Sequence, residues 1–214
     1  MEKRASWIIA CAVAAAVFYC LPWTEHITAG FTMNGFDLAE WASLHPAVRS
    51  SFPPMLTSFL LRAPHVALTG ILALAAQALH HTRLRWLVWF GAAAFLLRLI
   101  PPAEFFTDAT NDPNYRQMLL LTALGFGLAA AAIPLRKAPE RIQRGIVAAL
   151  FAAGAVAGGI GLSRAWVLLD NFEIDATTGI GAIGFAGVSA IAAVLVLWPS
   201  FAPRQHEAQN KKGG

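Results

Sequence analysis

The chain has 214 residues, of which 57% are hydrophobic and only 13% are charged. One soluble core cannot bury that much apolar surface, which excludes an ordinary soluble domain and indicates that lipid solvates much of the chain. The formal net charge of +4 does not indicate nucleic-acid binding, because the basic residues bracket apolar segments and form no patch interleaved with exposed aromatic side chains. The sequence therefore predicts an all-α integral membrane protein.

Six apolar segments follow one another along the chain, at residues 6–23, 54–79, 86–100, 117–135, 145–169 and 178–198. A helix that crosses a bilayer needs about 20 predominantly apolar residues, so we expect each segment to be a transmembrane helix. Because most connections are short, successive helices should pack antiparallel in one bundle of six. Residues 1–198 are thus predicted to form a single polytopic domain, followed by a disordered cytoplasmic tail at 199–214.

The charged residues predict the orientation of this bundle. Both termini and every second gap between apolar segments are basic, and these regions hold most of the 16 Lys and Arg residues. The intervening gaps hold most of the 12 Asp and Glu residues. Since short basic loops remain in the cytoplasm, we expect a multi-pass protein of the cell membrane with both termini cytoplasmic.

The longest connection, residues 24–53, is predicted to face outward and to contain a short helix at about residues 38–45. Asp37 and Glu40 have the spacing of a capping box, and Pro46 would end the helix. The apolar side of this helix favours a position flat on the outer membrane surface or over the bundle. It would serve either as an amphipathic cover or as a lid over an outward-facing pocket.

The second apolar segment carries the sharpest local feature, a polar face made by Ser58, Arg62, His65 and Thr69. Their spacings of four, three and four place all four side chains on one side of a helix. If the helix begins near Pro54, Arg62 lies roughly 12 Å along it, within the hydrocarbon layer. A charge there costs about 2.5–3.5 kcal/mol on insertion scales unless it is paired or reaches water. We therefore expect this face to point into the bundle and to form a candidate binding site.

Two further arginines, Arg98 and Arg164, lie in the outward halves of their segments. Carboxylates in the neighbouring loops are candidate ion-pair partners for the three arginines; they are Glu104, Asp108, Asp112, Asp170 and Glu173. Through such pairs the arginines could staple outer loops onto the helices, or they could reach the interface by snorkelling. Alternatively, the three arginines and His65 could line an outward-facing cavity that accepts an anion or a lipid phosphate.

Small residues mark the last two segments. The glycines concerned are Gly154, Gly158 and Gly161 on the fifth segment and Gly181, Gly184 and Gly187 on the sixth. Glycine allows helix backbones to approach closely within a membrane. We therefore expect the fifth and sixth helices to pair through these faces.

No cofactor or metal site is expected. His65 is the only histidine deep in a predicted span, whereas haem ligation by two histidines needs a second one at matching depth. The residues Asp108, Asn111, Asp112 and Asn114 lack the alternation of a calcium-binding loop and are typical of turns. The sequence also contains no serine-nucleophile motif, HExxH or phosphate-binding GxxxxGK[ST].

Three functions are compatible with these features. The first is a small non-catalytic accessory or assembly subunit of a membrane complex, favoured by the missing catalytic motifs and the glycine faces. The second is a transporter or binding protein for a small anion or lipid, acting through an outward-facing Arg and His site. The third is an outer-leaflet lipid-modifying enzyme with His65 as base. The expected partners are the lipid bilayer and other membrane subunits or further copies of the chain, with no nucleic acid.

Overall fold

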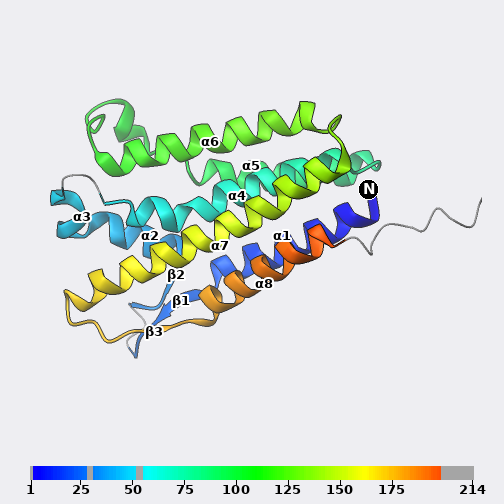
Figure 1. Cartoon of the computed structure of the whole chain (residues 1–214). Coiled ribbons are helices and arrows are strands. Elements are labelled where there is room, and N and C mark those ends of the chain that lie inside the picture. Colours follow the sequence, from blue (N-terminus) through cyan, green and yellow to red (C-terminus); the bar gives the residue numbers. More distant parts are fainter. Residues whose placement is uncertain (1, 28–30, 52–54, 199–214) are drawn as a thin grey trace, which may run out of the picture.

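The computed structural model describes residues 2–27, 31–51 and 55–198, and most of these residues are helical. The helices are α1 (Glu2–Cys20), α2 (Gly35–Leu44), α3 (Pro46–Ser50), α4 (Thr57–Gln77), α5 (Thr82–Leu97), η2 (Ala103–Phe106), α6 (Pro113–Leu135), α7 (Glu140–Asp170) and α8 (Ile180–Leu197). The strands are β1 (Pro22–Glu25), β2 (Met33–Asn34) and β3 (Thr177–Thr178). The axes of the long helices are roughly aligned, and the helices form one bundle (Figure 1). The predicted tail at 199–214 lies outside the described residues.

Within the described part of the chain, four helices are long and apolar enough to cross a membrane: α4, α6, α7 and α8. The two other predicted segments also fold as helices, but the apolar part of α1 runs only from Arg4 to Cys20, and α5 has 16 residues. α1 stops at Cys20 because Pro22 cannot continue a helix. The structure thus indicates a helical membrane protein with four clear candidate spans, and the full set of six stays a prediction.

α4 is the central helix of the bundle. The buried share of its 18-residue apolar window is 83%, compared with 28–33% in α6, α7 and α8. It packs against α5, α6, α7, α1 and α2. The buried polar side chains of α4 therefore meet protein and not lipid.

One end of the bundle, called the α2 end below, holds α2, α3 and a small antiparallel sheet with the order β2-β1-β3 (Figure 1). Thr24 of β1 pairs with Thr178 of β3, so the connection after α1 is tied to the one before α8. The sequence does not predict this sheet, because its strands have only two to four residues.

α2 begins at Gly35, earlier than predicted, because its cap is Asn34 and not Asp37. Asn34 Oδ1 accepts hydrogen bonds from the backbone N–H groups of Phe36 (2.9 Å) and Asp37 (3.0 Å). Its side-chain amide donates to Asp37 Oδ2 at 2.6 Å. Asn34 and Asp37 therefore make the capping pair expected of Asp37 and Glu40, which leaves the carboxylate of Glu40 available for another partner.

Arginines fasten helices together at the opposite end, called the N-terminal end below. Arg4 of α1 donates to Glu140 of α7 at 2.8 Å. Arg144 of α7 donates to carbonyls at the end of α8, from Nε to Val196 (2.7 Å) and from Nη2 to Leu197 and Trp198. The last carbonyls of a helix have no partner within it, so Arg144 acts as a C-terminal cap for α8.

The glycines of α7, which are Gly154, Gly158 and Gly161, lie where this helix approaches α4 and Trp23 of β1. A Cβ on Gly161 would lie 2.9 Å from the backbone nitrogen of Leu61, and one on Gly154 would lie 3.2 Å from the Cβ of Ala67. The expected pairing of the α7 and α8 glycine faces is therefore corrected: this face serves the contact of α7 with α4.

The glycines of α8 likewise face α1 and the start of β1. A Cβ on Gly184 would clash with the ring of Phe18, and one on Gly181 with the carbonyl oxygen of Pro22. Gly187 differs from the expectation, because the space around its Cβ position is open. The close approach that glycine permits thus joins α8 to α1, although α7 and α8 also pack together through other residues.

Candidate functional site

The polar face predicted on the second apolar segment lies in the first half of α4. Ser58, Arg62, His65 and Thr69 are all buried, with at most 2% exposure. Ser58 Oγ donates to Gln117 Oε1 in α6 at 3.2 Å, and Thr69 donates to the carbonyl of His65 at 2.8 Å. α4 begins at Thr57, so Arg62 lies only about 7.5 Å along the helix, less deep than the sequence predicts.

Arg62 has an incomplete set of hydrogen bonds. Its Nη1 donates to Asn114 Oδ1 at 2.5 Å, and its Nη2 lies 3.9 Å from Glu40 Oε2. The second distance makes an ion pair but is too long for a hydrogen bond. Arg62 Nε and Nη2 therefore have no hydrogen-bond partner among the described residues, although the side chain is only 1% exposed. A buried donor without an acceptor costs about 1–3 kcal/mol, so the guanidinium can still gain from another acceptor.

Two elements bring partners to Arg62. Asn114 lies in the first turn of α6, which begins at Pro113 because Asp112 caps it and accepts the N–H of Asn114 at 2.8 Å. Glu40 lies in α2, which covers the beginning of α4. The side chain of Glu40 is 60% exposed, so Arg62 is joined to the surface through this one carboxylate.

Three aromatic rings enclose His65. The ring of Tyr19 lies 4.6 Å from the imidazole, Phe36 5.8 Å and Phe95 5.6 Å, each edge to face. His65 Nδ1 has no hydrogen-bond partner among the described residues. His65 thus lies inside the packed core and not in an outward-facing cavity, contrary to one of the sequence-based hypotheses.

The three arginines do not form a single cluster. Arg98 is near the site. It occupies the C-cap position of α5, and its guanidinium lies 4.2 Å from the centre of the Phe36 ring in a cation–π contact. Arg164 is exposed on α7, and no hydrogen bond or ion pair joins it to the described residues. The structure therefore brings Arg62, His65 and Arg98 around α2 and leaves Arg164 apart.

The carboxylates predicted as partners of these arginines pair differently. Among the described residues, the ion pairs at this end are Arg49 with Asp112 (3.5 Å) and Arg62 with Glu40. The other four predicted carboxylates, which are Glu104, Asp108, Asp170 and Glu173, make no ion pair with the three arginines. The loops that carry them are held by turns and caps, so no stapling by Arg98 or Arg164 is present.

A small cavity lies beside the site, between α2, α3, α4 and α6. Its volume is about 20 Å³, and Ser58, Asn114, Gln117 and Arg49 are among its lining residues. This volume is close to the space that one water molecule needs. The structure therefore has no room for a large ligand next to Arg62. Such a ligand would have to take the place of the Glu40 carboxylate or displace α2.

Sequence reasoning missed three contributors to the site: Tyr19, Glu40 and Asn114. The hydroxyl of Tyr19 donates to the carbonyl of Leu61 at 2.8 Å, close to Pro64, which lies inside α4. The sequence places Glu40 in a capping box with Asp37, and Asn114 in an ordinary turn. No sequence signal connects Glu40 with Arg62, because Asn34 with Asp37 and Asp37 with Glu40 have the same capping spacing.

No group of His, Cys, Asp and Glu among the described residues could hold a metal ion. The arrangement at Arg62 can bind an oxyanion, because a rigid guanidinium offers two unused nitrogens. No protein-family model matches the chain, and no curated protein or solved structure is significantly similar to it.

Proposed function

We propose that this chain is a non-catalytic multi-pass membrane protein that binds a small oxyanion, a carboxylate or a phosphate, at Arg62. The observation that supports it most directly is the buried guanidinium with Nε and Nη2 lacking acceptors. Carboxylates and phosphates accept two parallel hydrogen bonds from an arginine, and Nε with Nη2 forms one edge of that fork. The bond from Nη1 to Asn114 holds the fork in one orientation.

Glu40 defines the route to this fork. Its carboxylate lies 3.9 Å from Nη2 and is largely exposed, so it neutralises Arg62 without filling the hydrogen-bonding edge. An incoming oxyanion would approach to about 2.7–2.9 Å and displace Glu40 by rotation of an exposed side chain. In this proposal Glu40 is an internal competitor, and α2 is the lid that carries it.

The site belongs to the outward face of the protein in this proposal. All six helices cross the cell membrane, both termini are cytoplasmic, and the α2 end with its acidic loops faces out. An oxyanion from the outside, or the phosphate of an outer-leaflet lipid, would then reach Glu40 first. A lipid-modifying enzyme with His65 as base has less support, because three aromatic rings separate the imidazole from such a substrate.

The test is calorimetric titration of the purified chain in an uncharged detergent with inorganic phosphate, acetate and short-chain phosphatidic acid. We expect saturable binding of at least one of them. Arg62→Lys should weaken it about tenfold or more, because a point charge cannot reproduce the planar fork. Glu40→Gln should strengthen it, because the internal competitor loses its charge. Preference for phosphatidic acid would identify a lipid as the source, and equal binding of phosphate would identify a free anion.

Arg116→Lys is the matched control, since Arg116 is an exposed arginine of the same end that donates to Thr110 and Asn111 and does not line the cavity. It should bind like the unaltered chain. If Glu40→Gln lowers the melting temperature and none of the three probes binds, the pair of Glu40 and Arg62 is a structural ion pair and the proposal fails.

A second candidate is the accessory or assembly subunit, and Arg164 is the observation that favours it. Arg164 is exposed on α7, next to the exposed side chains of Ile160 and Val156, which lie one and two turns earlier. A charge on a lipid-facing helix surface is costly unless a partner or the interface compensates it. A partner helix with a carboxylate at this depth would do so.

Native purification followed by mass spectrometry tests this candidate. A stoichiometric partner that is lost in Arg164→Gln, and retained in Arg141→Gln at the other end, would establish a subunit contact through Arg164. A chain that purifies alone under the same conditions would contradict it.

A further inference from the structure

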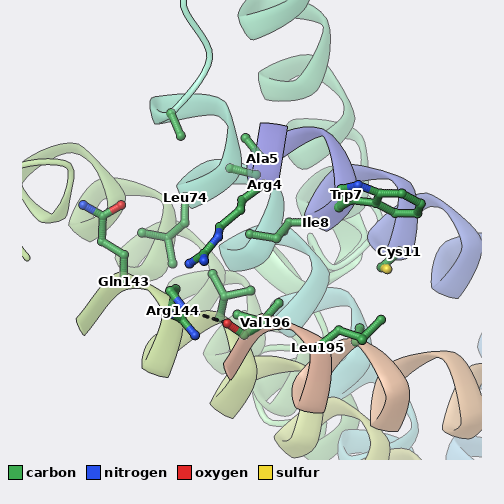
Figure 2. Close-up of a pocket in the computed structure, with 14 residues that line it drawn as sticks. Arg4, Ala5, Trp7, Ile8, Cys11, Leu74, Gln143, Arg144, Leu195 and Val196 are labelled. Atoms are coloured by element: carbon green, nitrogen blue, oxygen red, sulfur yellow. Dashed lines mark hydrogen bonds between the residues drawn. The ribbon is translucent and has the colours of Figure 1, made fainter. Parts of the chain in front are cut away.

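A second site lies at the N-terminal end, far from Arg62, where α1, α4, α7 and α8 enclose a groove (Figure 2). Its volume is about 160 Å³. Figure 2 shows Arg4 and Arg144 side by side at one part of the groove, with Trp7 and Cys11 at the other. Trp7 is 66% exposed and Leu195 is 44% exposed, so the groove opens sideways between α1 and α8, toward the lipid.

Small side chains on three of the four contributing helices create the space. They are Ala5 on α1, Ala75 and Ala78 near the end of α4, and Ala192 on α8. The remaining walls are apolar, with Ile8, Leu74 and Val147 among them. Apolar walls offer water few hydrogen-bond partners, so water fills such a groove poorly. Its walls are suited to a segment of hydrocarbon chain.

The charged side chains that line the groove are Arg4 and Arg144, and Gln143 adds a neutral amide. Arg4 donates to Glu140 at 2.8 Å, and Arg144 donates from Nε and Nη2 to the carbonyls at the end of α8. These contacts hold both guanidinium groups beside the groove, and among the described residues only Arg4 is paired with a carboxylate there. Further basic residues extend this charge over the same end: Arg83, Arg85, Arg136, Lys137 and Arg141. The surface is therefore complementary to an anion with a hydrocarbon tail.

We propose that this groove binds one anionic phospholipid of the bilayer, with an acyl-chain segment along its apolar walls and the phosphate at Arg4 and Arg144. Lys and Arg clusters next to membrane helices attract anionic head groups. Arginine forks bind phosphate bidentately. Among the described residues Arg4 uses Nη1 for Glu140, so its Nε and Nη2 form the fork for the phosphate, whereas Arg144 keeps its contacts with α8 and contributes its positive charge. This site uses none of the residues around Arg62, so it stands or falls separately from the proposed anion site.

The two native cysteines provide a direct test. Cys11 lines the groove, whereas Cys20 is exposed at the far end of α1. Phosphatidylglycerol added to the chain in an uncharged detergent should slow alkylation of Cys11 by N-ethylmaleimide, as followed by peptide mass spectrometry. Phosphatidylcholine should protect it far less, and neither lipid should change the rate at Cys20.

Two variants separate the head group from the acyl chain. Arg4→Gln should weaken phosphatidylglycerol binding, measured by native mass spectrometry, about tenfold and bring it close to phosphatidylcholine binding. Ala192→Phe should fill the groove and remove the protection of Cys11 by any lipid. Arg141→Gln is the control, because Arg141 is an exposed cation of the same end that does not line the groove.

Equal protection by both lipids, or equal loss of binding in Arg4→Gln and Arg141→Gln, would overturn the proposal, since the attraction would then be apolar or diffuse. Thermal unfolding of each variant shows whether it is folded. If Ala192→Phe does not fold, the unaltered chain still decides the matter through the comparison of Cys11 with Cys20.

Discussion

Arg62 shows how a single charge is accommodated in an apolar bundle. Helix α4 buries the guanidinium, Asn114 satisfies one nitrogen, and Glu40 supplies a counter-charge at 3.9 Å. Nearby, the guanidinium of Arg98 makes a cation–π contact with the ring of Phe36. Arg62 thus has a counter-charge but lacks hydrogen-bond acceptors for Nε and Nη2 among the described residues, and an added oxyanion would supply them.

The hydroxyl of Tyr19 is predicted to stabilise the bundle. Pro64 has no N–H for the carbonyl of Leu60, and the adjacent carbonyl of Leu61 accepts the hydroxyl of Tyr19 at 2.8 Å. Tyr19→Phe should therefore lower the free energy of unfolding by about 0.5–1.5 kcal/mol, as measured by unfolding in detergent. Tyr115→Phe is the control and should have no effect, because the Tyr115 hydroxyl makes no hydrogen bond with the described residues. Equal stability of the two variants would mean that the hydroxyl of Tyr19 contributes nothing.

At the scale of elements, close packing of α7 on α4 determines where the site lies. Gly161 permits the backbone of α7 to lie against Leu61, the residue whose carbonyl Tyr19 binds. α1, α4 and α7 therefore meet at one level, directly beneath α2. On the polar face of α4, Ser58 and Arg62 contact α6 and α2. The ring of His65, one turn after Leu61, packs against Tyr19 of α1.

Gly161→Ala and Gly159→Ala form a matched pair that tests this packing. The new Cβ at Gly161 would lie 2.9 Å from the backbone nitrogen of Leu61, whereas nothing lies within 4 Å of the one at Gly159. Alanine is the better helix former by about 1 kcal/mol. We expect Gly161→Ala to lower the melting temperature and Gly159→Ala to leave it unchanged or raise it. A loss of similar size in both would show that α7 does not approach α4 as closely as described.

The sequence predicts elements better than it predicts their partners. Hydropathy locates every long helix, and spacing places Arg62 and His65 on one face, because both depend on neighbours along the chain. Glu40 could not be assigned, since Asn34 with Asp37 and Asp37 with Glu40 have the same capping spacing. Helix rotation is not encoded in hydropathy either, so the separation of Arg164 from the other arginines appears only in the folded bundle.

At the scale of the whole molecule, the two ends of the bundle differ in charge. The N-terminal end gathers the start of α1, the connections from α4 to α5 and from α6 to α7, and the end of α8 (Figure 1). These segments are basic. The α2 end carries most of the carboxylates, among them Glu40, Asp112 and Asp170. A folded bundle that separates charge in this way should be inserted with its basic end in the cytoplasm.

Reporter fusions test this orientation. A chain fused after Trp198 should give a fluorescent protein that folds only in the cytoplasm and an inactive alkaline phosphatase, which requires the outside. A chain fused after Thr110, in the connection from α5 to α6 at the α2 end, should give the opposite pair of results. The reason is that the positive charges at the N-terminal end resist translocation, while carboxylates contribute little to that resistance. The reverse pattern would place Glu40 and Arg62 on the cytoplasmic side, and the same pattern in both fusions would show that α6, α7 and α8, which lie between the two fusion points, do not all cross the membrane.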